Sequence, residues 1–271
     1  MTWSWRRCAL SASQAEPPIV EPSDDDVPVL SVEDVTVRFG GVQAVSSANI
    51  TAYAGHITGL IGPNGAGKTT TFNVITGLEK PTEGRIVVEG RDVSRLSPYR
   101  RARLGMARTF QRLEVFGSLT TRENVLAAAE FRRAWSHDKS DPREVTDEIL
   151  ERVGLQSVAE LRVESLPTGL ARLVELGRAL ATRPRLLLLD EPGSGLDNTE
   201  TEALGDLLLD LAQEGMAILL VEHDVDLVMR ICDRIHVLDF GKVIAVGTTA
   251  EVQADPVVQA AYLGADVEGA A

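Results

Sequence analysis

The chain has 271 residues, with 27 Lys and Arg against 40 Asp and Glu, which gives a formal net charge of −13. The length fits one large domain or two small ones, and the 44% hydrophobic and 25% charged residues are ordinary globular proportions. These values exclude wholesale disorder, collagen and a coiled-coil rod. The acid excess disfavours general nucleic-acid binding, which needs clustered Lys and Arg, but a few backbone N–H groups and one Lys can still hold a phosphate.

Two cysteines, Cys8 and Cys232, stand far apart, so no disulfide framework is expected and a reducing compartment fits best. No apolar run approaches the roughly 18 residues that a membrane-spanning helix needs. We therefore expect a cytoplasmic protein that requires a partner for any work at a membrane. Residues 1–28, rich in Pro, Ser and acidic side chains, are predicted to form a disordered or appended tail.

The first elements after the tail are predicted to be strands. Period-two alternation favours a strand over 31–39, and a further strand is expected over 42–54. A short apolar strand over 56–61 then leads through a Gly-rich loop into a helix that begins near Lys68, and a further strand follows over 85–88.

The middle of the chain, 97–161, is predicted to be mostly helical, with helices over 121–130 and 143–153. The remaining elements alternate between helix and strand. They are a helix over 168–182, a strand over 185–190, a helix near 200–214, a strand over 217–221, a short helix and a strand over 234–238. This alternation predicts an α/β fold in which helices cover both faces of a parallel sheet.

The strongest chemical signal is a G-x-x-x-x-G-K-[ST] motif between a predicted strand and a predicted helix. It consists of Gly62, Pro63, Asn64, Gly65, Ala66, Gly67, Lys68, Thr69 and Thr70. Glycines let successive N–H groups curve around an anion, and the helix start adds the positive end of a dipole. Lys68 is placed to reach the β- and γ-phosphates and Thr69 to offer a hydroxyl to Mg²⁺. The motif predicts a phosphate-binding loop for a nucleoside triphosphate.

The second signal is an apolar strand, 186–189, that ends in the adjacent carboxylates Asp190 and Glu191. Ligands of parallel sheets bind beyond the carboxyl ends of the strands. Asp190 is therefore expected to bind Mg²⁺, directly or through water. Glu191 could accept a proton from the attacking water or orient that water.

Several short strings accompany these motifs in a fixed order. Phe39 ends a predicted strand, and T-F-Q at 109–111, S-G-L-D at 194–197 and V-E-H-D at 221–224 follow the phosphate-binding loop. With them the chain resembles a nucleotide-binding subunit of an ABC transporter over about residues 29–263. The resemblance implies a P-loop NTPase parallel-sheet core with an N-terminal antiparallel β subdomain and a helical subdomain. The implied boundaries are an ABC ATPase domain over 29–264, with its helical subdomain at about 112–165, and a C-terminal tail over 265–271.

The resemblance also implies roles for single residues. Phe39 would stack on adenine, and Gln111 would contact Mg²⁺ or water and link the site to a membrane partner. His223 would hydrogen-bond the γ-phosphate. Asp197 would approach the nucleotide of an opposite subunit, because in this family two subunits pack head to tail around ATP.

The signature motif of the family, commonly L-S-G-G-Q, is altered in this chain. The aligned residues are Leu166, Pro167, Thr168, Gly169 and Leu170. Pro167 replaces the Ser whose hydroxyl would reach the opposite γ-phosphate, and Leu170 replaces the Gln. Pro is favoured at a helix start, so the helix N-terminus can still face an anion, and we hypothesise that Thr168 supplies the hydroxyl. The change leaves the strength of ATP-driven closure open.

Further strings are similar to those of branched-chain amino acid importers. They are G-M-A-R-T-F-Q at 105–111, L-T-T-R-E-N-V at 119–125, G-K-V-I-A-V-G at 241–247 and P-V-V-Q-A-A-Y-L-G at 256–264. The implied protein hydrolyses ATP with Mg²⁺ on the cytoplasmic face of the cell membrane. Its implied partners are membrane permease subunits, a second nucleotide-binding subunit and, indirectly, a solute-binding protein.

Other interpretations stay open at this point. Relatives in the same branch move urea, amides or other small polar solutes, and the direction of transport is carried by the membrane partner. The altered signature motif also fits a binding subunit with weak hydrolysis. A soluble ABC ATPase of DNA repair or translation is disfavoured, because the chain has one phosphate-binding loop, no long coiled-coil arm between Gln111 and Leu166, and no basic stripe.

Overall fold

The computed structural model describes residues 27–136 and 138–268. Its N-terminal part is an antiparallel four-stranded sheet in the order β2-β1-β4-β5. The strands are β1 (Leu30–Phe39), β2 (Val42–Ala52), β4 (Glu83–Val88) and β5 (Arg91–Asp92). This sheet confirms the predicted strands over 31–39, 42–54 and 85–88. Residues 1–26 of the predicted tail lie outside the described residues.

The second sheet has six strands in the order β10-β9-β3-β8-β7-β6. Its strands are β3 (Ile57–Ile61), β6 (Met106–Arg108), β7 (Leu186–Asp190), β8 (Ala217–Val221), β9 (Arg234–Asp239) and β10 (Lys242–Gly247). All neighbours pair in parallel except β9 and β10. The parallel sheet is therefore as predicted. The mostly helical middle was wrong at β6, because its three residues are too short for a periodic signal and their pairing with β7 decides their conformation.

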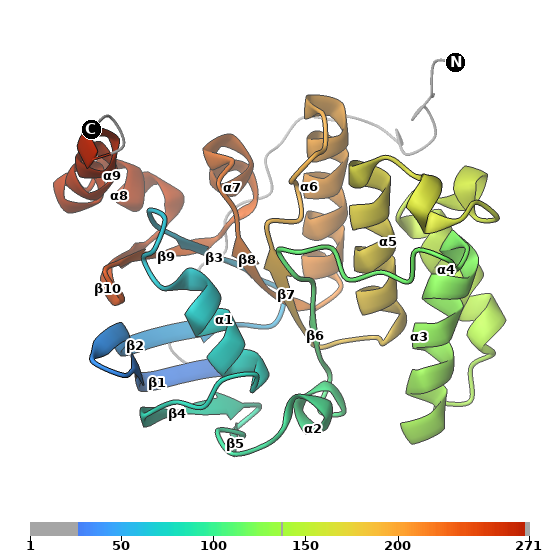
Figure 1. The fold of residues 1–271 in the computed structure, drawn as a ribbon, viewed down its shortest axis with the longest axis horizontal. Coiled ribbons are helices and arrows are strands. Elements are labelled where there is room, and N and C mark those ends of the chain that lie inside the picture. The colour runs from blue at the N-terminus through green and yellow to red at the C-terminus, as the bar shows by residue number, and fades with distance from the viewer. Residues whose placement is uncertain (1–26, 137, 269–271) are drawn as a thin grey trace.

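The helices cover the six-stranded sheet and form a group at one side of it, where Figure 1 shows α3, α4 and α5 packed together. The helices are α1 (Lys68–Thr76), α2 (Pro98–Ala102), α3 (Thr121–Trp135), α4 (Pro142–Arg152), α5 (Thr168–Ala181), α6 (Asn198–Gln213), α7 (Val225–Ile231), α8 (Thr249–Ala254) and α9 (Pro256–Glu268). Short 3₁₀ helices lie at Gln156–Val158 and Val163–Ser165. In the described ranges, none of these helices combines the length and apolar character that a membrane-spanning helix requires.

The predicted domain boundaries stay predictions. Helix α5, which follows the predicted helical subdomain 112–165, packs against α3 and α4. Within the predicted tail over 265–271, the backbone of α9 is helical to Glu268, and 269–271 lie outside the described residues.

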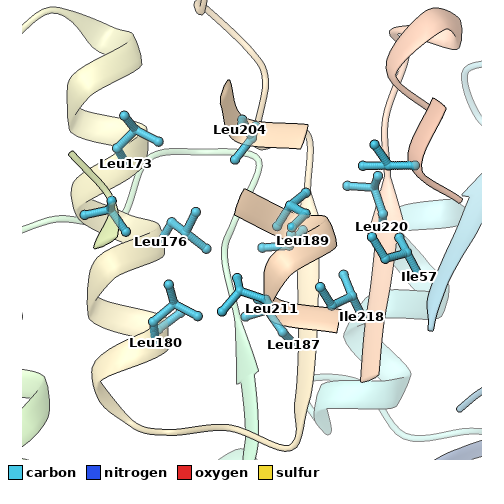
Figure 2. Packing of buried hydrophobic residues seen from close by; sticks show 14 of the residues in the cluster. Ile57, Leu173, Leu176, Leu180, Leu187, Leu189, Leu204, Leu211, Ile218 and Leu220 are labelled. Carbon is cyan, nitrogen blue, oxygen red and sulfur yellow. The ribbon is translucent and has the colours of Figure 1, made fainter. Parts of the chain in front are cut away.

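Strand β7 separates two hydrophobic cores, because successive strand residues point to opposite faces of a sheet. Leu187 and Leu189 face α5 and α6, as Figure 2 shows. Leu186 and Leu188 belong to the other core, which also contains side chains of α1 and of the four-stranded sheet. Asp190 follows Leu188 by two residues, so its side chain points to the same face of the sheet as Leu186 and Leu188. The last residue of β7 therefore lies on the α1 side.

Candidate functional site

The phosphate-binding loop connects β3 to α1 in a backbone conformation that requires glycine. Gly62, Gly65 and Gly67 have φ angles of +151°, +78° and +104°. A Cβ atom at Gly62 would overlap the carbonyl oxygen of Leu238, and one at Gly67 would lie 2.6 Å from the carbonyl oxygen of Ala44. Side chains are thus excluded where the loop curves into the N-terminus of α1, and its N–H groups are left to meet an anion.

Lys68, the first residue of α1, folds back across this loop. Its side chain donates to the carbonyl oxygens of Gly62 at 2.6 Å and Pro63 at 3.0 Å. Burial lowers the pKa of Lys68, and the nearby carboxylates Glu191 and Asp190 oppose that shift. The ammonium group is therefore held at one wall of the site by groups that favour its charged form.

A cavity of about 260 Å³ opens beside the loop. Its lining residues are Ala44, Asn64, Gly65, Ala66, Gly67, Lys68, Thr69, Thr70, Gln111, Glu191, Val221 and His223. The structure thus joins the loop to three predicted residues that are distant in the sequence. Nucleotide contacts of these residues remain predictions.

Glu191 is the shared partner of the other polar side chains in the cavity. Its Oε1 atom accepts a hydrogen bond from Nε2 of Gln111 at 3.1 Å and lies 2.9 Å from Nε2 of His223. The backbone of Glu191 has φ +53°, and its N–H donates to the carbonyl oxygen of Val221 at 2.9 Å. A left-handed conformation is unfavourable for a residue with a side chain, so the neighbouring strand holds this carboxylate in a strained position.

Asp190 lies one residue earlier and is buried. Its Oδ2 atom is 2.8 Å from Nη2 of Arg108, at the end of β6. Burial raises the pKa of Asp190, and the hydrogen bond and charge of Arg108 oppose this shift. Sequence reasoning missed Arg108, whose only signal was its place in the string that precedes Gln111.

The loop that carries Gln111 is held by two further residues that sequence reasoning missed. Glu175, on α5, accepts from the backbone N–H groups of Phe110 at 3.2 Å and Glu114 at 3.3 Å. Arg172, one turn earlier, donates to the carbonyl oxygens of Phe110 and Gln111. The sequence did contain one signal for these two residues. Arg172 and Glu175 are an oppositely charged pair at i and i+3 within the apolar stripe of α5, and charged residues are rarely buried unless they are paired.

The remaining predicted site residues lie away from the cavity. Phe39 ends β1 with 47% of its surface exposed. Pro167 precedes α5 and Thr168 begins it, with an exposed side chain. Asp197 caps α6 by accepting from the N–H of Glu200 at 2.8 Å. None of Phe39, Asp197 and residues 166–170 lines the cavity within this chain, so their proposed contacts need a nucleotide or a second subunit and stay predictions.

The residues present fit a magnesium ion bound together with phosphate. Thr69, Gln111 and Asp190 supply a hydroxyl, an amide and a carboxylate oxygen, and Mg²⁺ prefers oxygen ligands. The described residues contain no cluster of His, Cys, Asp and Glu that could hold a metal alone. A Mg²⁺ ion bound here would take its other ligands from nucleotide phosphates and water.

Comparisons with known proteins give two family matches. The model described as ABC transporter matches residues 45–194, and the model described as Branched-chain amino acid ATP-binding cassette transporter matches residues 242–268. The chain is 40% identical over 254 residues to LivG of Escherichia coli K12, a high-affinity branched-chain amino acid transport ATP-binding protein, covering 88% of this chain and 98% of LivG. It is 35% identical over 236 residues to LptB of Haemophilus influenzae, a lipopolysaccharide export system ATP-binding protein, covering 87% and 97%.

Two solved structures share the fold. MJ1267, an ATP-binding cassette of an ABC transporter, has a TM-score of 0.78 at 31% identity and covers 87% of this chain and 99% of its own. The dimeric ATP-binding cassette MJ0796, in a post-hydrolysis state with ADP and Pi bound, has a TM-score of 0.73 at 27% identity, with 81% and 98% covered.

Proposed function

Because the chain belongs to the ABC transporter family, we propose that it is the ATP-hydrolysing subunit of an importer and that the imported solute is a branched-chain amino acid. The observation that carries hydrolysis is the Glu191 carboxylate, engaged by Gln111 and His223 in the cavity beside the phosphate-binding loop. The match of residues 242–268 and the identity to LivG support the solute.

The site residues divide the chemistry among them. The loop amides and Lys68 hold the phosphates and stabilise charge on the transferring phosphoryl oxygens. Glu191 orients the attacking water and accepts its proton, and His223 donates to the γ-phosphate. Mg²⁺, held by Thr69, Gln111 and Asp190, supplies further neutralisation of phosphate charge when it is bound.

Two subunits complete each site in this proposal. Residues 166–170 and Asp197 lie outside the cavity of their own chain, and in this proposal they contact the nucleotide of a second copy or a related subunit. A two-fold pair of chains would contain two such sites. The dimeric state of MJ0796 supports this arrangement. ATP binding then favours the closed pair, and hydrolysis removes the phosphate that bridges it.

The permease partner would dock in an apolar groove of about 590 Å³ between α2, α3, β6 and α5. Its lining includes the aromatic side chains of Tyr99, Phe110, Phe116, Phe131 and Trp135. Tyr99 and Phe131 are more than half exposed, which is unusual for side chains of this size without a partner. Phe110 adjoins Gln111, so a permease segment in this groove would act on the catalytic loop from the cytoplasmic face of the membrane.

A second candidate function is ATP supply to an exporter, which the 35% identity to LptB favours. Urea, amides and other small polar solutes also remain candidates for import. Reconstitution with the cognate permeases and solute-binding protein, followed by uptake of radiolabelled leucine in vesicles, separates these functions. Leucine uptake that requires ATP supports the first proposal, and ATP turnover without uptake contradicts its solute.

Lys68→Ala tests the nucleotide site itself. Loss of charged hydrogen bonds of about 1.5–3 kcal/mol should weaken binding of a fluorescent ATP analogue about 10- to 100-fold. Lys80→Ala is the matched control, because Lys80 is exposed and does not line the cavity. Equal affinity in the Lys68 variant and the unaltered protein would contradict the proposal.

A further inference from the structure

Arg108 is the cation that joins the buried carboxylate of the site to the helix behind it. Its side chain is 6% exposed and that of Asp190 2%. While Nη2 contacts Oδ2 of Asp190 at 2.8 Å, Nη1 donates to Oδ1 of Asn73 at 2.7 Å. Asn73 belongs to α1, and Asp190 ends β7. One guanidinium group therefore connects the helix of the phosphate-binding loop to the predicted metal ligand.

The guanidinium group has little freedom to move. The ring of Phe72, on α1, lies 5.4 Å from its central carbon, and the ring of Phe110, next to Gln111, lies 4.8 Å from it. Both distances permit cation–π attraction. A planar guanidinium group in contact with these rings can bind Asn73 and Asp190 in fixed directions, which the single ammonium group of Lys cannot do.

We propose that Arg108 is a positioning residue that fixes the Asp190 carboxylate for the Mg²⁺ ion of the bound nucleotide. Arg108 engages Oδ2, and the hydrogen bonds of the described residues include none to Oδ1, so Oδ1 is the oxygen that we assign to the metal. The positive charge also compensates a carboxylate that would otherwise be buried alone. This inference rests on the proposed function, since it assumes that the cavity receives ATP together with Mg²⁺.

Arg108→Lys keeps the charge and removes the fork. In a complex of the protein with a fluorescent ATP analogue, the Mg²⁺ concentration at the midpoint of the titration should rise about 10- to 100-fold, the usual effect of losing a residue that orients a metal ligand. Affinity for the analogue in EDTA should stay within about 2-fold, because Arg108 does not line the nucleotide cavity. Arg103→Lys is the matched control, because Arg103 is an exposed arginine whose guanidinium group lies over the Tyr99 ring. It should leave the Mg²⁺ midpoint and the affinity in EDTA unaltered.

Asn73→Ala removes the other anchor of the fork and provides a second variant. It should raise the Mg²⁺ midpoint by less, and the two substitutions together should act less than additively, because they break one network. It also carries the test if Arg108→Lys unfolds.

The outcomes separate this inference from the proposed function. If the unaltered protein does not bind the analogue, the proposed function fails. If it does, and Arg108→Lys has the same Mg²⁺ midpoint, or loses affinity equally in EDTA and in Mg²⁺, the positioning role is overturned alone.

Discussion

The buried side chain of His236 is expected to make the folded protein less stable in mild acid. Substitution of His236 should remove this contribution to the pH dependence of the unfolding free energy. It lies on β9, paired with the strand that leads into the phosphate-binding loop, and only 3% of its surface is exposed. Within the described part of the chain, neither ring nitrogen has a hydrogen-bond partner. Burial, and secondarily the charge of Arg234, lowers the pKa of His236 to about 4, while the backbone of Thr51 opposes the shift without forming a bond of normal geometry.

The direction of the pH effect on stability follows from which state binds the proton more tightly. The unfolded chain takes up the proton near pH 6.5, whereas the folded chain takes it up only near pH 4, so stability falls as the pH drops from about 6.5 to about 4 and is flat below. At about 1.4 kcal/mol per pKa unit, the full effect of the shift from 6.5 to about 4 is about 3.5 kcal/mol. Between about pH 7 and pH 5, His236 should account for about 2 kcal/mol of lost unfolding free energy.

The measurement is urea unfolding of the protein and of His236→Leu at both pH values. Carboxylates titrate alike in the two proteins, so the difference between their pH slopes isolates the histidine. His236→Gln is the control, because it keeps a polar side chain but cannot titrate, and its pH slope should match that of the Leu variant. A slope in either variant as steep as in the unaltered protein would refute the reasoning.

Two predictions concern the nucleotide site. Glu191→Gln should keep ATP binding within a few-fold, lower turnover by about 10²- to 10⁴-fold through loss of the proton acceptor, and accumulate the dimer in size-exclusion chromatography with ATP. Normal turnover in this variant would remove the proposed role of Glu191. Thr168→Ala should lower turnover about 10-fold, the loss of one charge-assisted hydrogen bond, without affecting ATP binding by the separate subunit. Unchanged steady-state ATPase activity would show that the Thr168 hydroxyl does not replace the missing Ser.

Elements with a marked apolar pattern could be predicted from the sequence, and a three-residue strand without such a pattern could not. Strand β8 was predicted at its observed bounds, 217–221, since a continuous apolar run that ends before Glu222 suits a strand buried on both faces. Strand β6 was missed, because Met106–Arg108 offers no periodicity and owes its conformation to hydrogen bonds with β7, about 80 positions later. Local pattern cannot report pairing of that kind.

The same distinction separates the site residues. Lys68 and Glu191 could be identified because each lies in a contiguous string whose chemistry is local. Arg108 meets Asp190 across 82 positions, and Glu175 meets Phe110 across 65, so their partners exist only after folding. In the structure, the burial of these charged side chains marks them as functional candidates. The amino-acid composition does not show which charged residues are buried.

The alternation of side chains along β7 has a consequence for tolerance to change. Leu187 and Leu189 fill the layer beneath α5 and α6, whereas Asp190 continues the opposite row toward Arg108. Inserting or deleting one residue within this strand would exchange the rows, bringing the carboxylate into hydrocarbon and a leucine to the guanidinium. A point substitution in β7 would disturb one of the two rows, whereas a change in strand length would disrupt the packing and displace the carboxylate together.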